Sequence, residues 1–160
     1  MPRLPDEYLD HLRGPVSARI GSADASGRPS ICRGLSTRVE DDGTIRVAFA
    51  RPAGPEVAEA IAQTGRVSVV WARPTTHLTL HVKGRDGRIA PADETLVAHT
   101  FAHMERFALE IATLGFTREQ IAQTWYAVAP AELVEVRFSI AGAWNQTPGP
   151  GAGAPIDLLP

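Results

Sequence analysis

The chain has 160 residues, of which 44% are hydrophobic and 21% charged, a composition typical of a folded domain with one core. Its formal net charge of -2 excludes the strong basic bias that extended binding to nucleic-acid phosphates requires. No apolar run approaches the roughly 18 residues of a membrane-spanning helix, so we expect neither a nucleic-acid partner nor a membrane.

Cysteine usage and the first residues bear on the compartment. Cys32 is the only cysteine, which excludes an intrachain disulfide and a cysteine-based zinc cluster. The stretch MPRLPDEYLDHLRG carries charges and prolines and lacks the apolar segment of a secretory signal. We therefore expect a cytoplasmic protein with one domain over residues 1–160.

The first half of the chain reads as a short helix followed by strands. Residues 1–14 have amphipathic spacing and end at Gly14-Pro15, which predicts an N-terminal helix. Strand patterns follow, separated by the turn DASGRP and by Asp42-Gly43, a strong hairpin signal. The predicted strands are residues 16–23, 30–39 and 44–50.

The second half of the chain alternates between the residue spacing of a helix and that of a strand. Pro55 suits a first helical position and Gly65 a helix end, so a helix is predicted between them. Two strands follow at 66–72 and 77–84, then helical spacing from Pro91 to Gly115. A further short helix is predicted from Thr117, where Thr117 and Gln120 have the spacing of a capping box. The last strand is 132–140, and residues 142–160 form a Gly/Pro-rich tail laid over the surface.

This order of elements predicts an α+β protein with a six-stranded antiparallel sheet that closes, or nearly closes, into a barrel with flanking helices. In the strand at 77–84, Leu78, Leu80 and Val82 share one side. The polar residues of the other side face either bulk water or a ligand groove. We expect no metal site, because His99 and His103 have helical ligand spacing but no third ligand is evident.

The ordered succession ARIGSADASGRPSICRGLS, DDGTIRVAFA, a short helix, GRVSVVW and LTLHVKGR resembles the pyridoxamine 5′-phosphate oxidase-like family, the FMN-binding split barrels. The resemblance covers residues 16–85, and the later region resembles only a subset of the family. It implies a split barrel that forms a homodimer, with FMN bound in grooves at the subunit interface.

The resemblance also implies which residues contact FMN. The strand through Arg33 runs along the flavin ring, the end of the next strand lies beside the ring and ribityl chain, and a later strand offers a polar side chain. Near the C-terminus an aromatic residue and polar groups approach the cofactor. The implied cofactor-binding residues are Arg33, Gly34, Leu35, Ser36, Phe49, Ala50, Arg51, His77, Thr79, Trp144 and Gln146.

One stretch departs from the family pattern. Many members place an Arg-Lys or Ser-Arg-Lys sequence before the short helix to hold the FMN phosphate, whereas this chain has RPAGPEV, with Arg51 as its one basic residue. Arg33, His77 and the free N–H groups of the helix are possible substitutes. Weak FMN binding, a different flavin-like ligand and loss of the cofactor all stay open.

We therefore predict an FMN-dependent oxidoreductase, of flavin reductase or oxidase type, that acts with a small-molecule substrate or electron donor. The alternative is a non-enzymatic protein that binds flavin, deazaflavin or haem, and a third reading is a barrel that serves as a dimerisation scaffold. No residue has the pattern of a general acid, base or nucleophile, so no catalytic residue is predicted.

Overall fold

The computed structural model of the protein describes residues 2–125 and 127–160. Within them the chain forms four α-helices, two short 3-10 helices and nine strands. In chain order these are α1 (Asp6–Arg13), β1 (Ser17–Ala23), β2 (Pro29–Gly34), β3 (Ser36–Val39), β4 (Ile45–Ala50), η1 (Arg51–Ala53), α2 (Pro55–Thr64), β5 (Val67–Ala72), β6 (Thr79–Gly84), β7 (Arg88–Pro91), α3 (Glu94–Ala112), α4 (Arg118–Trp125), η2 (Pro130–Glu132), β8 (Leu133–Phe138) and β9 (Gly142–Asn145).

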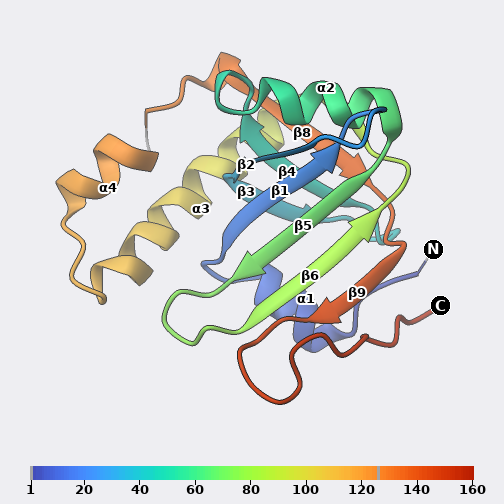
Figure 1. The fold of residues 1–160 in the computed structure, drawn as a ribbon. Helices are drawn as coiled ribbons and strands as arrows, with labels where there is room; N and C mark the ends of the chain where they lie inside the picture. Colours follow the sequence, from blue (N-terminus) through green and yellow to red (C-terminus); the bar gives the residue numbers. More distant parts are fainter. Residues whose placement is uncertain (1, 126) are drawn as a thin grey trace.

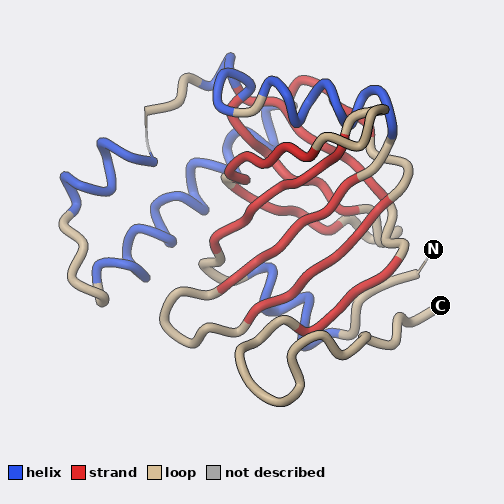
Figure 2. The backbone as a smooth tube through the Cα atoms, in the orientation of Figure 1, coloured by secondary structure: helices blue, strands red, loops and turns tan. Residues whose placement is uncertain are grey.

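The strands form two antiparallel sheets (Figures 1 and 2). One has the order β2-β1-β5-β6-β9 and the other β3-β4-β8-β7. The α+β class is as predicted, but the expected six-stranded barrel is corrected to nine described strands in two sheets that do not close. The predicted strand 30–39 divides at Leu35, and two four-residue strands, β7 and β9, form in segments read as connection and tail.

The division at Leu35 is where the chain passes from one sheet to the other. The Leu35 N–H donates to the Ala48 carbonyl at 2.7 Å, so pairing with β4 begins there. Gly34 permits the passage, because a Cβ at this position would lie 2.8 Å from the Ala18 Cβ and 3.0 Å from a Val47 methyl carbon. The two sheets are therefore joined through a position that only glycine fits without movement.

The main core lies between the sheets and follows the alternation of the strands. Val67, Val69 and Trp71 of β5 point inward, as do Leu80 and Val82 of β6. The sequence predicted the shared side of Leu80 and Val82, but Leu78, expected on the same side, lies before β6 and is 39% exposed. Trp71 is fully buried and its indole N–H donates to Thr37 Oγ1 at 2.7 Å. Burial of these side chains is the main stabilising contribution to the fold.

The helices cover the ends and one side of the two sheets (Figure 1). α2 crosses one end against β1 and β2, and it stops as predicted at Gly65, which has a φ of 66° and donates its N–H to the Ile61 carbonyl at 2.8 Å. α1 and α3 pack on β3, and α4 packs on α3. The predicted capping box is present, because Thr117 and Gln120 exchange hydrogen bonds of 2.8 and 3.2 Å.

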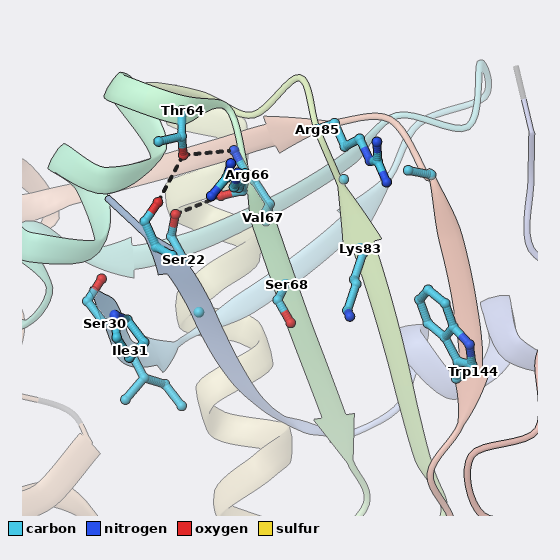
Figure 3. Close-up of a pocket in the computed structure, with 15 residues that line it drawn as sticks. Ser22, Ser30, Ile31, Thr64, Arg66, Val67, Ser68, Lys83, Arg85 and Trp144 are labelled. Carbon is cyan, nitrogen blue, oxygen red and sulfur yellow. Dashed lines mark hydrogen bonds between the residues drawn. The ribbon is translucent and has the colours of Figure 1, made fainter. Parts of the chain in front are cut away.

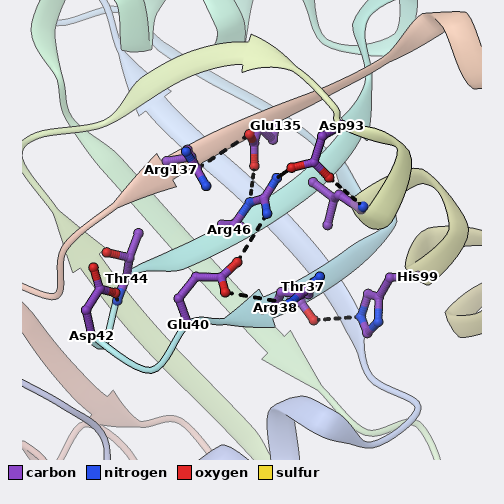
Figure 4. A network of polar contacts seen from close by, with 11 residues as sticks. Thr37, Arg38, Glu40, Asp42, Thr44, Arg46, Asp93, His99, Glu135 and Arg137 are labelled. Carbon is purple, nitrogen blue, oxygen red and sulfur yellow. Dashed lines mark hydrogen bonds and ion pairs between the residues drawn. The ribbon is translucent and has the colours of Figure 1, made fainter.

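Arg46 of β4 links the four-stranded sheet to the start of α3 (Figure 4). Its guanidinium donates to Glu135 Oε2 at 2.5 Å, Asp93 Oδ2 at 2.6 Å and Glu40 Oε1 at 3.1 Å. Asp93 is also the N-cap of α3, since it accepts from the Leu96 N–H at 2.8 Å. This network fixes the entry of α3 relative to β4 and β8.

The C-terminal tail is held against the edge of the five-stranded sheet. β9 pairs with β6, and the chain then turns back so that the Ile156 N–H donates to the Ala143 carbonyl at 2.9 Å. Arg3 and Leu159 exchange backbone hydrogen bonds of 2.9 and 2.8 Å, which places the two ends of the described chain side by side. Among the described helices, none has the length and apolarity to cross a bilayer.

Candidate functional site

The five-stranded sheet buries one face in the core and leaves the other without a covering element from the described residues (Figure 1). We call the second the outer face. Because directly paired residues point to the same side of a sheet, the register aligns its side chains in rows. One row is Ile31, Gly21, Ser68, Lys83 and Gly142, and the next is Arg33, Arg19, Val70, His81 and Trp144.

A groove of about 920 Å³ opens on this face (Figure 3). Its size is that of a small-molecule or cofactor site. One wall comes from the β1–β2 hairpin, a second from the end of α2 and the start of β5, and a third from the end of β6 with Ala141 and Trp144. The lining residues are Gly21, Ser22, Ala23, Pro29, Ser30, Ile31, Thr64, Arg66, Val67, Ser68, Lys83, Gly84, Arg85, Ala141 and Trp144.

The charges of the groove have one sign. Arg66, Lys83 and Arg85 line it, and none of the other described residues in its lining is an aspartate or a glutamate. Asp86, which follows Arg85, instead accepts a hydrogen bond from the Ser139 N–H at 2.9 Å. Three cations around a concave surface attract an anion such as a phosphate.

Lys83 is the only lysine of the chain, and it lies over the indole of Trp144. Its ammonium nitrogen is 5.2 Å from the ring centroid, a cation–π distance. The indole lies back along β9 over Gly142: a Cβ at Gly142 would lie 2.7 Å from the indole Cη2. Glycine at this position therefore allows the indole to form one wall of the groove.

Ser68 and His81 form a polar pair on neighbouring strands of the outer face. Ser68 Oγ and His81 Nε2 are 2.8 Å apart, and the imidazole lies 5.5 Å from the Trp144 ring. Burial, and secondarily the charge of Lys83, lower the pKa of His81, so it is neutral at neutral pH. The pair can direct a hydrogen bond toward a ligand in the groove.

The cofactor-binding residues predicted from the sequence lie in several different parts of the structure. Of these predicted residues, Trp144 is the one that lines the groove. Arg33 lies on the outer face opposite Arg19; burial, and then the charge of Arg19, lower its pKa to about 10. Arg33, Gly34 and Leu35 line a second, small cavity of about 30 Å³ beside His103. Arg33 therefore lines this small cavity and not the groove.

Three predicted residues on β3 and β4 lie at or near the core. The Ser36 side chain is buried and shares a 2.7 Å hydrogen bond with Thr100 Oγ1 of α3. Phe49 has 0% exposure, so its ring belongs to the core. Ala50 ends β4 half-buried, and Arg51 is exposed at the first position of η1.

The remaining predicted residues lie at the far edge of the outer face. His77 is exposed in the β5–β6 loop with a φ of 59°, a conformation uncommon for a residue with a side chain. The Thr79 hydroxyl donates to the His77 carbonyl at 2.8 Å, and the Gln146 N–H donates to the Thr79 carbonyl at 2.8 Å. Gln146 itself is exposed.

Sequence reasoning did not single out Ser68, Arg66 or Arg85. Ser68 had a signal in the sequence, since it alternates with the inward-facing Val67 and Val69. The two arginines had none, because their positions in the lining of the groove depend on how α2 and the β6–β7 turn meet the sheet. Among the described residues, no group of three or more histidine, cysteine or carboxylate side chains is placed to hold a metal ion.

Known proteins resemble this chain through structure alone: no protein-family model and no curated protein sequence matches it. An F420 reductase matches with a TM-score of 0.54 and 16% identity over 88% of this chain and 98% of its own. A candidate pyridoxamine 5′-phosphate oxidase from Lactobacillus delbrueckii matches at 0.52 and 15% over 89% and 93%. This chain has the pyridoxamine 5′-phosphate oxidase-like split-barrel fold.

The heme storage protein HutZ from Vibrio cholerae has the same fold, with a TM-score of 0.52 and 17% identity over 89% of this chain and 94% of its own. The split-barrel likeness inferred from the order of strands is thus confirmed at the level of fold.

Proposed function

We propose that this split-barrel protein is an FMN-dependent oxidoreductase whose cofactor lies on the outer face, in the groove beside Trp144. The observation that supports this proposal is the groove itself, which has a volume of about 920 Å³ and is lined by three cations and the Trp144 indole, with no carboxylate among its described lining residues. FMN combines a flat aromatic ring with a doubly charged phosphate, and both parts have a counterpart among these residues.

The three cations of the groove could take the place of the basic residues that many family members have before the short helix. The basic pair that many family members place before α2 is missing, whereas Arg66 just after α2, Lys83 in β6 and Arg85 just after β6 line the groove. These three side chains would hold the phosphate, and the Ser68–His81 pair would offer hydrogen bonds to the ring. Electron transfer is the chemistry that the flavin supplies when bound.

A homodimer is part of the proposal. The outer face exposes 70% of Ile31 and leaves Val70 and Trp144 half-buried, so one subunit by itself leaves apolar surface in water beside the groove. A second copy that packs on this face would bury that surface and narrow the groove around a flat ligand. The substrate or electron donor would then approach the ring from the side left open.

A second candidate is a protein that binds deazaflavin or haem without catalysing a reaction. It is supported by the fold shared with an F420 reductase and a heme storage protein, and by His77, which is exposed in the β5–β6 loop beside the same face. An imidazole in such a position can reach an axial site on haem iron.

Ligand titration separates these candidates. Purified protein is mixed in turn with FMN, F420 and haemin, and the visible absorption and the flavin fluorescence are followed. We expect saturable binding of FMN, and steady NAD(P)H oxidation in its presence identifies an enzyme rather than a carrier. Absence of any FMN binding contradicts the leading proposal, and binding of haemin alone favours the second candidate.

Matched variants locate the binding site. Lys83→Gln removes one cation from the groove and is expected to weaken FMN binding by about tenfold or more, the effect of one charge-assisted hydrogen bond. Arg88→Gln removes the same charge from an exposed position on β7 of the other sheet and serves as the control. Equal loss of affinity in both variants would mean that only net charge matters.

A further inference from the structure

A third cavity lies where α1, β3 and α3 meet, and it shares no lining residue with the groove on the outer face. Its volume is about 360 Å³, enough for a small molecule. Leu9, Leu12 and Val39 give it an apolar wall, and Leu12 is buried. The rest of the lining is polar, and none of the described residues that line the cavity is a carboxylate.

Three arginines line this cavity, one from each element: Arg13 of α1, Arg38 of β3 and Arg106 of α3. No described carboxylate lies within ion-pair distance of Arg106. Its acidic neighbour one turn along the helix is Glu110, but Glu110 accepts hydrogen bonds from Arg73 at 2.9 and 3.1 Å and from Thr75. The charge of Arg106 is therefore uncompensated by its own helix.

The other two arginines have weak partners. Arg38 lies 3.6 Å from Glu40, but that carboxylate also accepts a 3.1 Å hydrogen bond from Arg46. Arg13 pairs with Asp10 at 2.9 Å, and both side chains are 73% exposed, so the pair contributes little. Both guanidinium groups can turn toward an anion in the cavity at small cost.

His99 completes the polar wall. Its Nε2–H donates to the Thr37 carbonyl at 3.0 Å, which fixes the ring beside the cavity. Burial lowers the pKa of His99, and the charges of Arg106 and Arg38 lower it further. The positive potentials of two arginines thus meet at this histidine, inside the space that a ligand would occupy.

We propose that this cavity binds a small amphipathic anion, a compact apolar body that carries one oxyanion group such as a phosphate or carboxylate. The apolar body contacts Leu9, Leu12 and Val39, and the oxyanion accepts hydrogen bonds from Arg106 and Arg38. The site is separate from the flavin groove and makes no use of its residues, so it stands whether or not FMN binds there.

Amide chemical-shift titration tests the site with phenyl phosphate as the probe, and with inorganic phosphate and phenol as its two halves. We expect phenyl phosphate to produce saturable shifts in α1, in residues 37–39 and around Arg106, with each half binding at least about tenfold more weakly. Shifts confined to the groove around Lys83 overturn the proposal, and so does inorganic phosphate that binds as tightly as phenyl phosphate.

A pair of arginine variants tests the contact itself. Arg106→Gln should weaken phenyl phosphate binding by about tenfold, the effect of one charge-assisted hydrogen bond. Arg118→Gln removes the same charge from α4, where the side chain is 91% exposed, and should change binding by less than about twofold. The same spectra show that each variant is folded, and unchanged affinity in Arg106→Gln refutes the assignment.

Discussion

Replacing Arg46 by methionine should destabilise the protein strongly, because it leaves a buried carboxylate without its main partner. The Arg46 side chain is 5% exposed and the Glu135 side chain 4% exposed, and their atoms are 2.5 Å apart. In the variant, the cation left to Glu135 is Arg137, at 3.5 Å and 48% exposed. Breaking a buried ion pair of this kind costs about 3–5 kcal/mol.

The other two partners of Arg46 add little to this figure, because the Asp93 side chain is 53% exposed and that of Glu40 is 29% exposed. For a chain of this length, a loss of 3–5 kcal/mol lowers the melting temperature by roughly 6–20 °C. Urea unfolding followed by circular dichroism measures the free energy directly.

The double variant Arg46→Met/Glu135→Met is the control, since removing both charges leaves no unpaired group in the core. It should recover most of the loss. A single variant destabilised by less than about 1 kcal/mol would refute the reasoning, as would a double variant no more stable than the single one.

Three further perturbations have defined outcomes. FMN should protect the single lysine, Lys83, from reductive methylation, and modification at an unchanged rate would place the cofactor elsewhere. His103 is buried, and its pKa is lowered to about 4, so as pH falls the unfolded chain takes up the imidazole proton before the folded protein does, and the free energy of unfolding decreases between about pH 6.5 and pH 4. In urea unfolding, His103→Gln should remove up to about 3 kcal/mol of this pH dependence. A variant with the same pH profile as the original protein would contradict this. Glu110→Gln should speed amide exchange in residues 109–115, because it releases α3 from Arg73. The free energy of unfolding should change by less than about 1 kcal/mol, because Arg73 is partly exposed. Unchanged exchange would show that this contact does not hold the helix.

Much of the fold could be predicted because local signals and tertiary structure agree. The alternation at Leu80 and Val82 gives the buried face of β6, and Gly65 and the Thr117–Gln120 pair give helix ends. Strand β9 was not predicted, because four residues in a Gly/Pro-rich segment are too few to show the alternation of a strand. Its pairing depends on the free edge of β6. The division between β2 and β3 was not predicted, because Gly34 and Leu35 continue an unbroken strand pattern in the sequence.

The candidate site was predictable only in part, for a similar reason. The polar side of β6 could be read from alternation, which places His81 and Lys83 on the outer face. The approach of Arg66 and Arg85 to that face depends on register and on where α2 ends, which no local pattern encodes. The basic cavity between α1, β3 and α3 likewise joins residues that are distant in the sequence.

Sedimentation velocity with simultaneous detection of protein and of the visible flavin band tests the central proposal most directly. A sample saturated with FMN and freed of excess is expected to show flavin absorbance that sediments with a species of twice the 17.2 kDa chain mass. Protein that sediments at the mass of one chain, or a dimer boundary without flavin absorbance, would contradict the account of a cofactor held on the outer face between two copies.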